Sequence, residues 1–330
     1  MSDSKPRSIN SPRLWLGIGV SIICIALVSR RIDWAAFARA LTSLNPIWLI
    51  GAALFNVLSY VFTGFRVRQV LAPQTWMPIR DAYDAVVISN LATLVAPSRA
   101  GDLAKAAFVS RKQSIPVSRV LGAVAVERFG DVAMLILLAA ALWFAVAFPP
   151  MIRAGVTAFT IAGIGALAAL LLAADWLPAL AGRCVSLVVP SWGPTIRAFL
   201  DGIFAGFRSA GGVRQFPGTL FWSLMIWISS AVAMWCVVEA FQLPVPWYAA
   251  CFVLLVVNLG GVIPASPGSI GLYHYLAVVA LTVWAVDPSV ALGFAVVAHA
   301  AGIVVVLLVG LGGLARQHES LFHVRRSATI

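Results

Sequence analysis

The chain has few charged residues. Of its 330 residues only 11% are Asp, Glu, Lys or Arg, whereas 61% are hydrophobic. This composition, with a mean hydropathy of +0.96, excludes a water-soluble domain built around one buried core. Charged side chains are costly inside a bilayer and mark functional sites there. The scarcity of charge therefore predicts an integral membrane protein, and it makes each charged residue informative.

Cysteine is also scarce and follows no pattern. The four cysteines form no CxxC pair, so we interpret them as small buried hydrophobic residues rather than disulfides or metal ligands. No His, Cys or carboxylate spacing resembles a metal site, and no Gly-rich phosphate loop is present. We therefore expect no metal, no other cofactor and no ATP-driven mechanism within this chain.

Acidic residues are outnumbered by basic ones, 12 to 23. A basic balance can indicate a nucleic-acid partner, but the distribution of charge favours a bilayer. With a cytoplasmic N-terminus, almost every Lys and Arg lies on the cytoplasmic side, Arg66 and Arg68 among them. The exceptions are Arg30, Arg31, Arg39 and Arg153. We expect a multi-pass protein of the bacterial inner membrane with both termini cytoplasmic, partnered by membrane lipids with anionic head groups and not by nucleic acid.

The chain contains several long apolar stretches. Eight are near the roughly 20 residues that a membrane span requires: Leu14–Val28, Ile47–Gly64, Val120–Phe148, Ile152–Ala174, Phe216–Ala240, Trp247–Ile263, Ile270–Val286 and Ala291–Leu314. The first lacks a cleavage site and is expected to stay as an anchor. Two half-length stretches, 85–96 and 103–109, are too short to span. We predict an all-α integral membrane protein with about eight transmembrane helices and a re-entrant or broken-helix segment in each half.

We expect one polytopic domain over residues 1–330. Its first half is 14–174, with a broken segment at 85–110, and its second half is 216–314, with a broken segment at 258–272. Between them, 175–215 is expected to be a cytoplasmic interfacial linker, where the spacing of Ile196–Phe207 suits a helix lying on the membrane surface. A cytoplasmic tail, 315–330, completes the chain.

The two broken segments resemble each other. In each, an Asn-Leu pair (at Asn90 and at Asn258) opens an apolar run that ends in a Pro, Ser and Gly break. Interrupted segments at matching places in two halves of a membrane protein point to a transport site and to an internal repeat. Chance similarity in a biased composition is the alternative explanation.

Each break can present groups for an anion. Proline and glycine at 264–271 interrupt the helix, and a helix that begins near Ser269 offers free N–H groups to a phosphate. In the first break, Asp102 would cap a helix with Lys105 close by, and Arg99 would present its planar fork. The alternatives are a plain loop between two spans for the second break, and a basic loop that only sets topology for the first.

Charged residues also lie inside the apolar stretch 120–148. Arg128 can pair with Asp131 at i,i+3, and Glu127 shares a face with Asp131 at i,i+4. Two carboxylates with one arginine need another cation, for which Arg99 and Lys105 are candidates. This group is either a polar lining for a head group or an ion pair that holds helices together.

The second half supplies histidines in place of charges. His274 and His299 are the intramembrane histidines, near Tyr273, Tyr275 and Asn258, where they either titrate with proton entry or serve as hydrogen-bonded core residues. We predict no catalytic residue. The predicted substrate-binding residues are Asn90, Arg99, Asp102, Lys105, Glu127, Arg128, Asp131, Asn258, Ser266, Gly268, His274 and His299.

Three motifs in order carry a family resemblance. They are the break from Pro97 to Asp102, the helix with Glu127, Arg128 and Asp131, and the break at 264–271 with the helix that runs to His299. With them the chain resembles the flippase-like family named for the transmembrane region of lysylphosphatidylglycerol synthases, which includes hopanoid-associated and archaeal glycosylation-associated members. Many members carry Glu after the second break, where this chain has His274, so a role assigned to that acid does not transfer directly.

The resemblance implies movement of a lipid or lipid-linked head group between leaflets. Because the chain ends soon after Leu314, we do not expect lysyl transfer. Our leading hypothesis is translocation of an anionic phospholipid or polyprenyl-linked lipid, with the two broken segments meeting near the midplane. The alternatives are a membrane-embedded transferase, or accessory subunit, for lipid-linked substrates, and a scaffold that partners a lipid-modifying enzyme.

Overall fold

The computed structural model describes residues 12–30, 32–95, 100–172, 176–190, 192–194, 196–197, 200–201, 204, 212–261, 263 and 265–327. Within these ranges the fold is all-helical, without a strand. The helices are α1 (Pro12–Ser29), α2 (Trp34–Thr42), α3 (Pro46–Leu71), α4 (Ile79–Val95), α5 (Ala100–Gln113), α6 (Val117–Leu142), α7 (Pro150–Leu172), α8 (Leu177–Val188), α10 (Phe216–Ala240), α11 (Tyr248–Gly260), α12 (Leu272–Leu281) and α13 (Pro288–Ser327), with short 3-10 turns η1 (Gly212–Gln215), η2 (Pro267–Ser269) and η3 (Thr282–Trp284).

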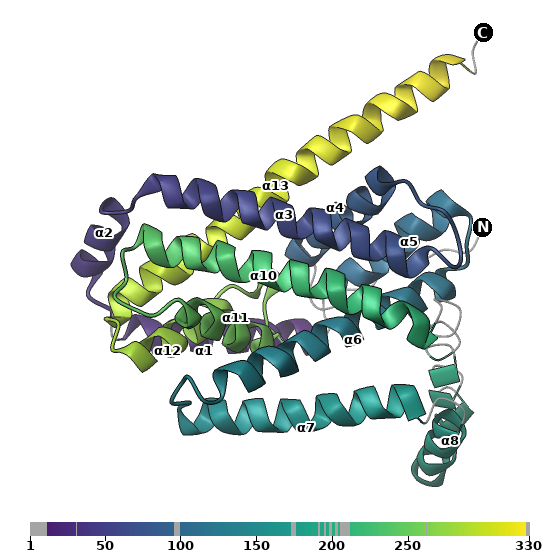
Figure 1. Ribbon diagram of the computed structural model, residues 1–330, viewed down its shortest axis with the longest axis horizontal. Helices are drawn as coiled ribbons and strands as arrows, with labels where there is room; N and C mark the ends of the chain where they lie inside the picture. The colour runs from purple at the N-terminus through teal and green to yellow at the C-terminus, as the bar shows by residue number, and fades with distance from the viewer. Residues whose placement is uncertain are drawn as a thin grey trace.

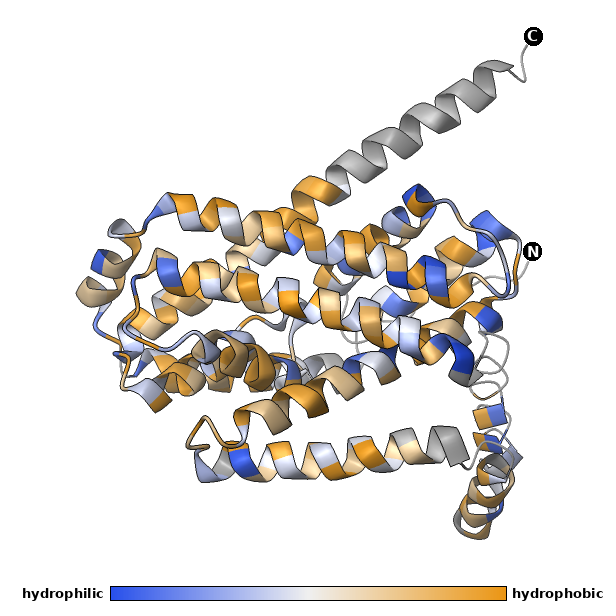
Figure 2. Ribbon diagram, viewed as in Figure 1, coloured by the Kyte–Doolittle hydropathy of each residue, from blue (hydrophilic) through white to orange (hydrophobic). Residues whose placement is uncertain are grey.

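Long apolar helices run side by side along the molecule. In the described chain, α3, α10 and the part Pro288–Gly310 of α13 are long and apolar enough to cross a membrane, and α1 with α2, bent by 92°, would make a fourth if counted as one broken span. Figure 1 shows α3, α6, α7 and α10 along the long axis, with their connections at the two ends. Hydrophilic residues gather toward those ends (Figure 2). This is the architecture of a multi-pass membrane protein.

Eight full spans are not found among the described helices. The stretches predicted as spans at 247–263 and 270–286 instead form α11, of 13 residues, and α12, of 10 residues. At 1.5 Å per residue these are about 20 and 15 Å long, too short for a hydrocarbon core of about 30 Å. Both are apolar because protein surrounds them, which a hydropathy window cannot distinguish from lipid. They pair across a break, as α4 and α5 do.

The helix order of the first half recurs in the second. Long helix α3 is followed by the short helices α4 and α5 and by long helix α6, and α10 is followed likewise by α11, α12 and α13. The helices α3 and α10 pack antiparallel, because Gly51 lies near Cys236 while Gln69 bonds Gln215. Contacts also correspond: α6 packs on α10, and α13 packs on α3. The two halves therefore have matching arrangements with opposite directions.

The second break is packed between other helices. Gly268 and Gly271 have φ values of +67° and +91°, which side chains rarely adopt, so the helix cannot continue through them. A Cβ atom at Gly271 would lie 2.6 Å from the carbonyl oxygen of Ser21 in α1, and Gly268 lies beside Leu94 near the end of α4. The break thus meets the tip of the first broken segment. Helix α12 begins at Leu272, three residues later than expected, since Gly271 occupies its N-cap.

Candidate functional site

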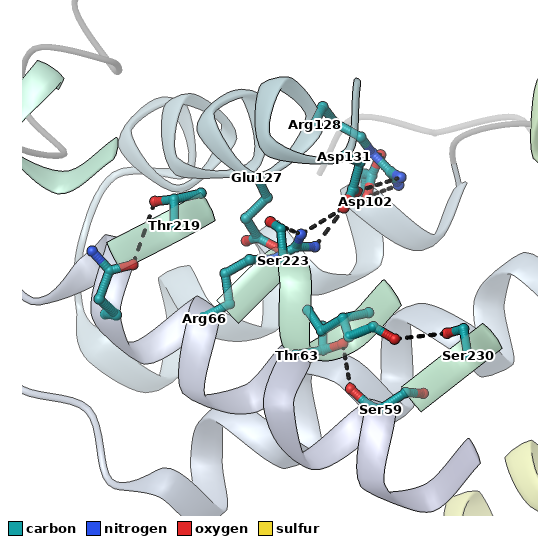
Figure 3. Close-up of polar contacts among 12 residues, drawn as sticks. Ser59, Thr63, Arg66, Asp102, Glu127, Arg128, Asp131, Thr219, Ser223 and Ser230 are labelled. Atoms are coloured by element: carbon teal, nitrogen blue, oxygen red, sulfur yellow. Dashed lines mark hydrogen bonds and ion pairs between the residues drawn. The ribbon is translucent and has the colours of Figure 1, made fainter. Parts of the chain in front are cut away.

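A polar stripe on α3 leads to a buried arginine. Asn56, Ser59, Thr63 and Arg66 recur every three or four residues and so share one face of the helix. The Arg66 side chain is only 6% exposed. Its Nη1 donates to Asp131 Oδ1 at 2.6 Å and to Ser223 Oγ of α10 at 2.9 Å (Figure 3). Arg66 therefore joins α3, α6 and α10.

Glu127 lies between two cations. Its Oε2 accepts from Lys105 Nζ at 3.0 Å and lies 3.5 Å from Arg66 Nη2, and all three side chains are less than one-tenth exposed. The additional cations that the carboxylates require are thus Lys105 and Arg66. Lys105 lies one turn from Asp102 on α5, as expected, and its ammonium group bonds the deeper Glu127 carboxylate.

Asp102 and Arg128 form a two-pronged ion pair. Arg128 Nη2 lies 2.7 and 2.8 Å from the two Asp102 oxygens, and its Nε donates to Oδ2 at 3.1 Å. The predicted i,i+3 pair of Arg128 with Asp131 is present at 3.7 Å. Asp102 lies within the first turn of α5, which begins at Ala100, so it is not at the N-cap position as expected. Its carboxylate is engaged by α6 instead.

The cluster balances charge and opens at one edge. Three carboxylates (Asp102, Glu127 and Asp131) meet three cations (Arg66, Lys105 and Arg128) across α3, α5 and α6. Such balance is what buried charge requires. Exposure rises from 5% for the Glu127 side chain to 23% for Asp131 and 62% for Arg128. An arginine fork that is exposed in this way can accept a phosphate or carboxylate.

The residues predicted in the second half form a separate group. The Ser266 N–H donates to Ser21 Oγ at 3.1 Å, and the ring centroids of His274 and His299 are 5.1 Å apart. Gly268 contacts α4 but not the charged cluster. Two further predicted residues lie on the helices that precede the breaks. Asn258 Nδ2 donates to the Leu254 carbonyl of its own helix, and Asn90 is half-buried on α4. Arg99 lies outside the described residues, as do Pro97, Ser98 and Pro264.

Arg66 is a site residue that its sequence position alone does not reveal. Expected only to lie on the cytoplasmic side, it is buried because residues far along the chain, Asp131 and Ser223, converge on it. The signal that was available is the polar stripe Asn56, Ser59, Thr63 and Arg66 on an otherwise apolar helix. A stripe of this kind faces protein rather than lipid.

Among the described residues, no cluster of three or more His, Cys, Asp or Glu side chains is arranged to hold a metal ion. What the fold and the site define is a helical multi-pass membrane protein with two broken helix pairs and a buried, charge-balanced network.

The comparison with known proteins gives the family. Residues 14–310 match the model of the lysylphosphatidylglycerol synthase TM region, and the chain belongs to this family, which confirms the resemblance. The chain is also 26% identical over 351 residues to "Glycosyltransferase AglD" of Haloferax volcanii, in an alignment that covers 96% of this chain and 56% of that protein. The chain thus spans a little over half the length of this curated relative. Both matches link it to membrane processes that involve lipids or glycosylation.

Proposed function

We propose that the protein moves an anionic phospholipid or polyprenyl-linked head group between the leaflets of the membrane. The observation that carries this proposal is the exposed side chain of Arg128, 62% accessible, whose guanidinium is held by Asp102, a side chain that is only 10% exposed. Arginine recognises phosphate by the same two-pronged geometry that it uses here with Asp102. A phosphate at this edge can take the place of that carboxylate.

The network supplies a partner for every charge during such an exchange. When a head group occupies Arg128, Asp102 must turn to another cation, and Lys105 stands one turn along the same helix. Asp102 and Glu127 then share the Lys105 ammonium group, and Glu127 also keeps its contact with Arg66. The head group thereby enters a low-dielectric region without leaving an isolated buried charge, which is the main barrier to its passage.

The helix directions support a path from one face to the other. We assign six crossings, by α1, α3, α6, α7, α10 and α13, of which α3, α10 and α13 each meet the length and apolarity expected of a span within the described residues. With the N-terminus in the cytoplasm, six crossings return the C-terminus to the cytoplasm, and the balance of Lys and Arg fits this orientation. The α4–α5 pair then enters from the cytoplasm and the α11–α12 pair from the opposite side. Their tips meet where Gly268 lies beside Leu94. Such an arrangement supports an inverted-repeat transporter, a class in which substrates bind near the interface of the two repeats.

Lipid scrambling in vesicles tests the proposal. The full chain is reconstituted in phosphatidylcholine–phosphatidylglycerol vesicles with a fluorescent phosphatidylglycerol, and loss of protected fluorescence after dithionite reports movement. We expect Arg128→Gln to slow movement about tenfold or more, equivalent to at least about 1.4 kcal/mol. Arg153→Gln is the matched control, since Arg153 is also exposed but lies against Trp143 at the start of α7. Equal rates for Arg128→Gln and wild type would refute the site, and no movement by wild type of this lipid or a polyprenyl phosphate would refute the function.

A second candidate is transfer of a sugar to or from a lipid-linked substrate within the membrane. It is favoured by the name of the archaeal relative, a glycosyltransferase. In that case Glu127 or Asp131 would serve as the acid or base beside a phosphate held by Arg128. Incubation of the purified chain with a polyprenyl-phosphate sugar distinguishes the two, because a transferase releases or transfers the sugar whereas a translocator leaves the lipid unchanged.

A further inference from the structure

A pair of imidazoles bridges the second broken segment to its following helix. The rings of His274 on α12 and His299 on α13 are 5.1 Å apart between centroids, and Tyr273 stacks on His299 at 4.4 Å. His274 Nδ1 accepts the N–H of Gly271 at 3.3 Å, which anchors this ring to the break and leaves its other nitrogen to gain or lose a proton.

The pair occupies the same position as the charged pair of the first half. Asp102 and His274 are each the third residue of their helices, α5 and α12. Arg128 and His299 are each the twelfth residue of the helices that follow, α6 and α13. At corresponding points, therefore, the first half holds a fixed ion pair and the second half holds two imidazoles.

In the described parts of α1, α11 and α12, the polar side chains on the faces that pack at the break are uncharged. They include the Tyr273 and Tyr275 phenols on α12, Ser21 and Cys24 on the buried face of α1, and Asn258 and Cys251 on α11, of which Tyr273 stacks on His299. On α4, which meets the break at Leu94, the charged residues Arg80, Asp81 and Asp84 are ten or more positions earlier, about 15 Å along the helix.

The helices packed against α13 hold their charges elsewhere. On α3, Arg66 belongs to the buried network and Arg68 lies over Trp76, while Arg39 of α2 is near Asp33. Glu239 lies in the last turn of α10. A proton on the pair would therefore be a large change in local charge.

We propose that His274 and His299 form a proton-binding site that couples lipid movement to protonation. The inference rests on the proposed function and names the coupling ion for it. Because two imidazolium charges this close repel each other, a proton on one ring opposes a proton on the other, and the pair binds at most one proton at a time. The proton comes from water, turns the uncharged end of the path cationic so that it attracts the anionic head group, and returns to water when the head group leaves.

Titration of the histidines tests the site without any lipid movement. The full chain, labelled with ¹⁵N-histidine, is placed in phosphatidylcholine nanodiscs and followed by NMR from acid to neutral pH. We expect His274→Gln to displace the titration midpoint of His299 by at least about half a pH unit, because a coupled neighbour is lost. His318 and His323, which complete the set of four histidines, serve as internal references. An unchanged His299 midpoint would overturn the proposal.

The coupling is tested in the vesicles described above. We expect the wild-type rate to differ by about fivefold or more between about pH 4 and about pH 7.5, and the rate of His299→Gln to differ by less than about twofold, since this variant lacks one imidazole of the pair. Tyr273→Phe, which keeps the stacked ring, should retain the wild-type profile. A wild-type rate that is independent of pH, or an unaltered profile in His299→Gln, would overturn the coupling. If wild type moves no lipid at any pH, the proposed function fails, and the NMR titration still decides whether the pair binds a coupled proton.

Discussion

The two broken helix pairs have the same layout and opposite chemistry. At the third residue of the second short helix and the twelfth of the following long helix, one half has Asp102 and Arg128, and the other has His274 and His299. Around the second pair, α11 is buried in apolar surroundings, with Phe252 and Leu255 both 0% exposed. Among the described residues of α11, α12 and the start of α13, the arrangement forms without an ion pair, so its geometry does not require the charges of the first half. We therefore attribute the charges of the first half to function rather than to the helix arrangement.

The largest expected effect comes from breaking the charged network at its centre. Glu127→Gln leaves Arg66 and Lys105 short of a partner in a buried site, and we expect a loss of about 3–5 kcal/mol in stability. The corresponding residue of α13 is Ala298, which shows that the fold itself accepts an uncharged side chain there. Thermal unfolding in detergent, followed by tryptophan fluorescence, measures the loss.

Asp201→Asn is the control for this change. Asp201 forms an exposed pair with Arg197 at 3.6 Å, and exposed pairs contribute about 1 kcal/mol or less. If Glu127→Gln destabilises the protein no more than Asp201→Asn does, the first half tolerates loss of charge as the second half does, and the contrast between the halves disappears.

A smaller effect is expected at the break of the uncharged half. Gly271→Ala places a Cβ atom against the Ser21 carbonyl at a φ of +91°, and we expect it to cost about 1–3 kcal/mol. In the same unfolding measurement, Gly165→Ala in α7 should change stability by about 1 kcal/mol or less, because no atom lies within 4 Å of its Cβ position. Equal behaviour of the two variants would mean that the backbone at the break is free to rearrange.

The smallest effect distinguishes the starts of the two long helices. Asp287 accepts from the N–H of Ser289 at 2.8 Å ahead of α13, whereas Pro116 offers α6 no side-chain cap. The Ser289 hydrogen bond lowers the pKa of Asp287, so its contribution is present above about pH 4 and is lost as the pH falls through the lowered value. We expect Asp287→Ala to cost about 1 kcal/mol at pH 7 and nothing near pH 2. A cost that is the same at both pH values would contradict this role.

Composition predicts the membrane class, and proline with glycine predicts both breaks, because these depend on local properties of the chain. The short length of α11 and α12 is not predictable in the same way, since an apolar helix in protein has the hydropathy of one in lipid. In the site, the spacing of Glu127 and Asp131 predicts that a cation must approach them. The identity of that cation depends on a distant contact, as Arg66 precedes Asp131 by 65 residues.

The packing of α1 against the second break sets the order in which the protein can assemble. The Ser21 hydroxyl accepts the N–H of Ser266, which lies 245 residues later in the chain. The N–H of Asp33 donates to the Ser289 hydroxyl, 256 residues later. Because synthesis proceeds from the N-terminus, the first helix enters the bilayer long before its partners exist. In a nascent chain that stops before η2, Ser21 of α1 therefore still lacks its partner. Helix α1 is the first to insert and among the last to complete its packing.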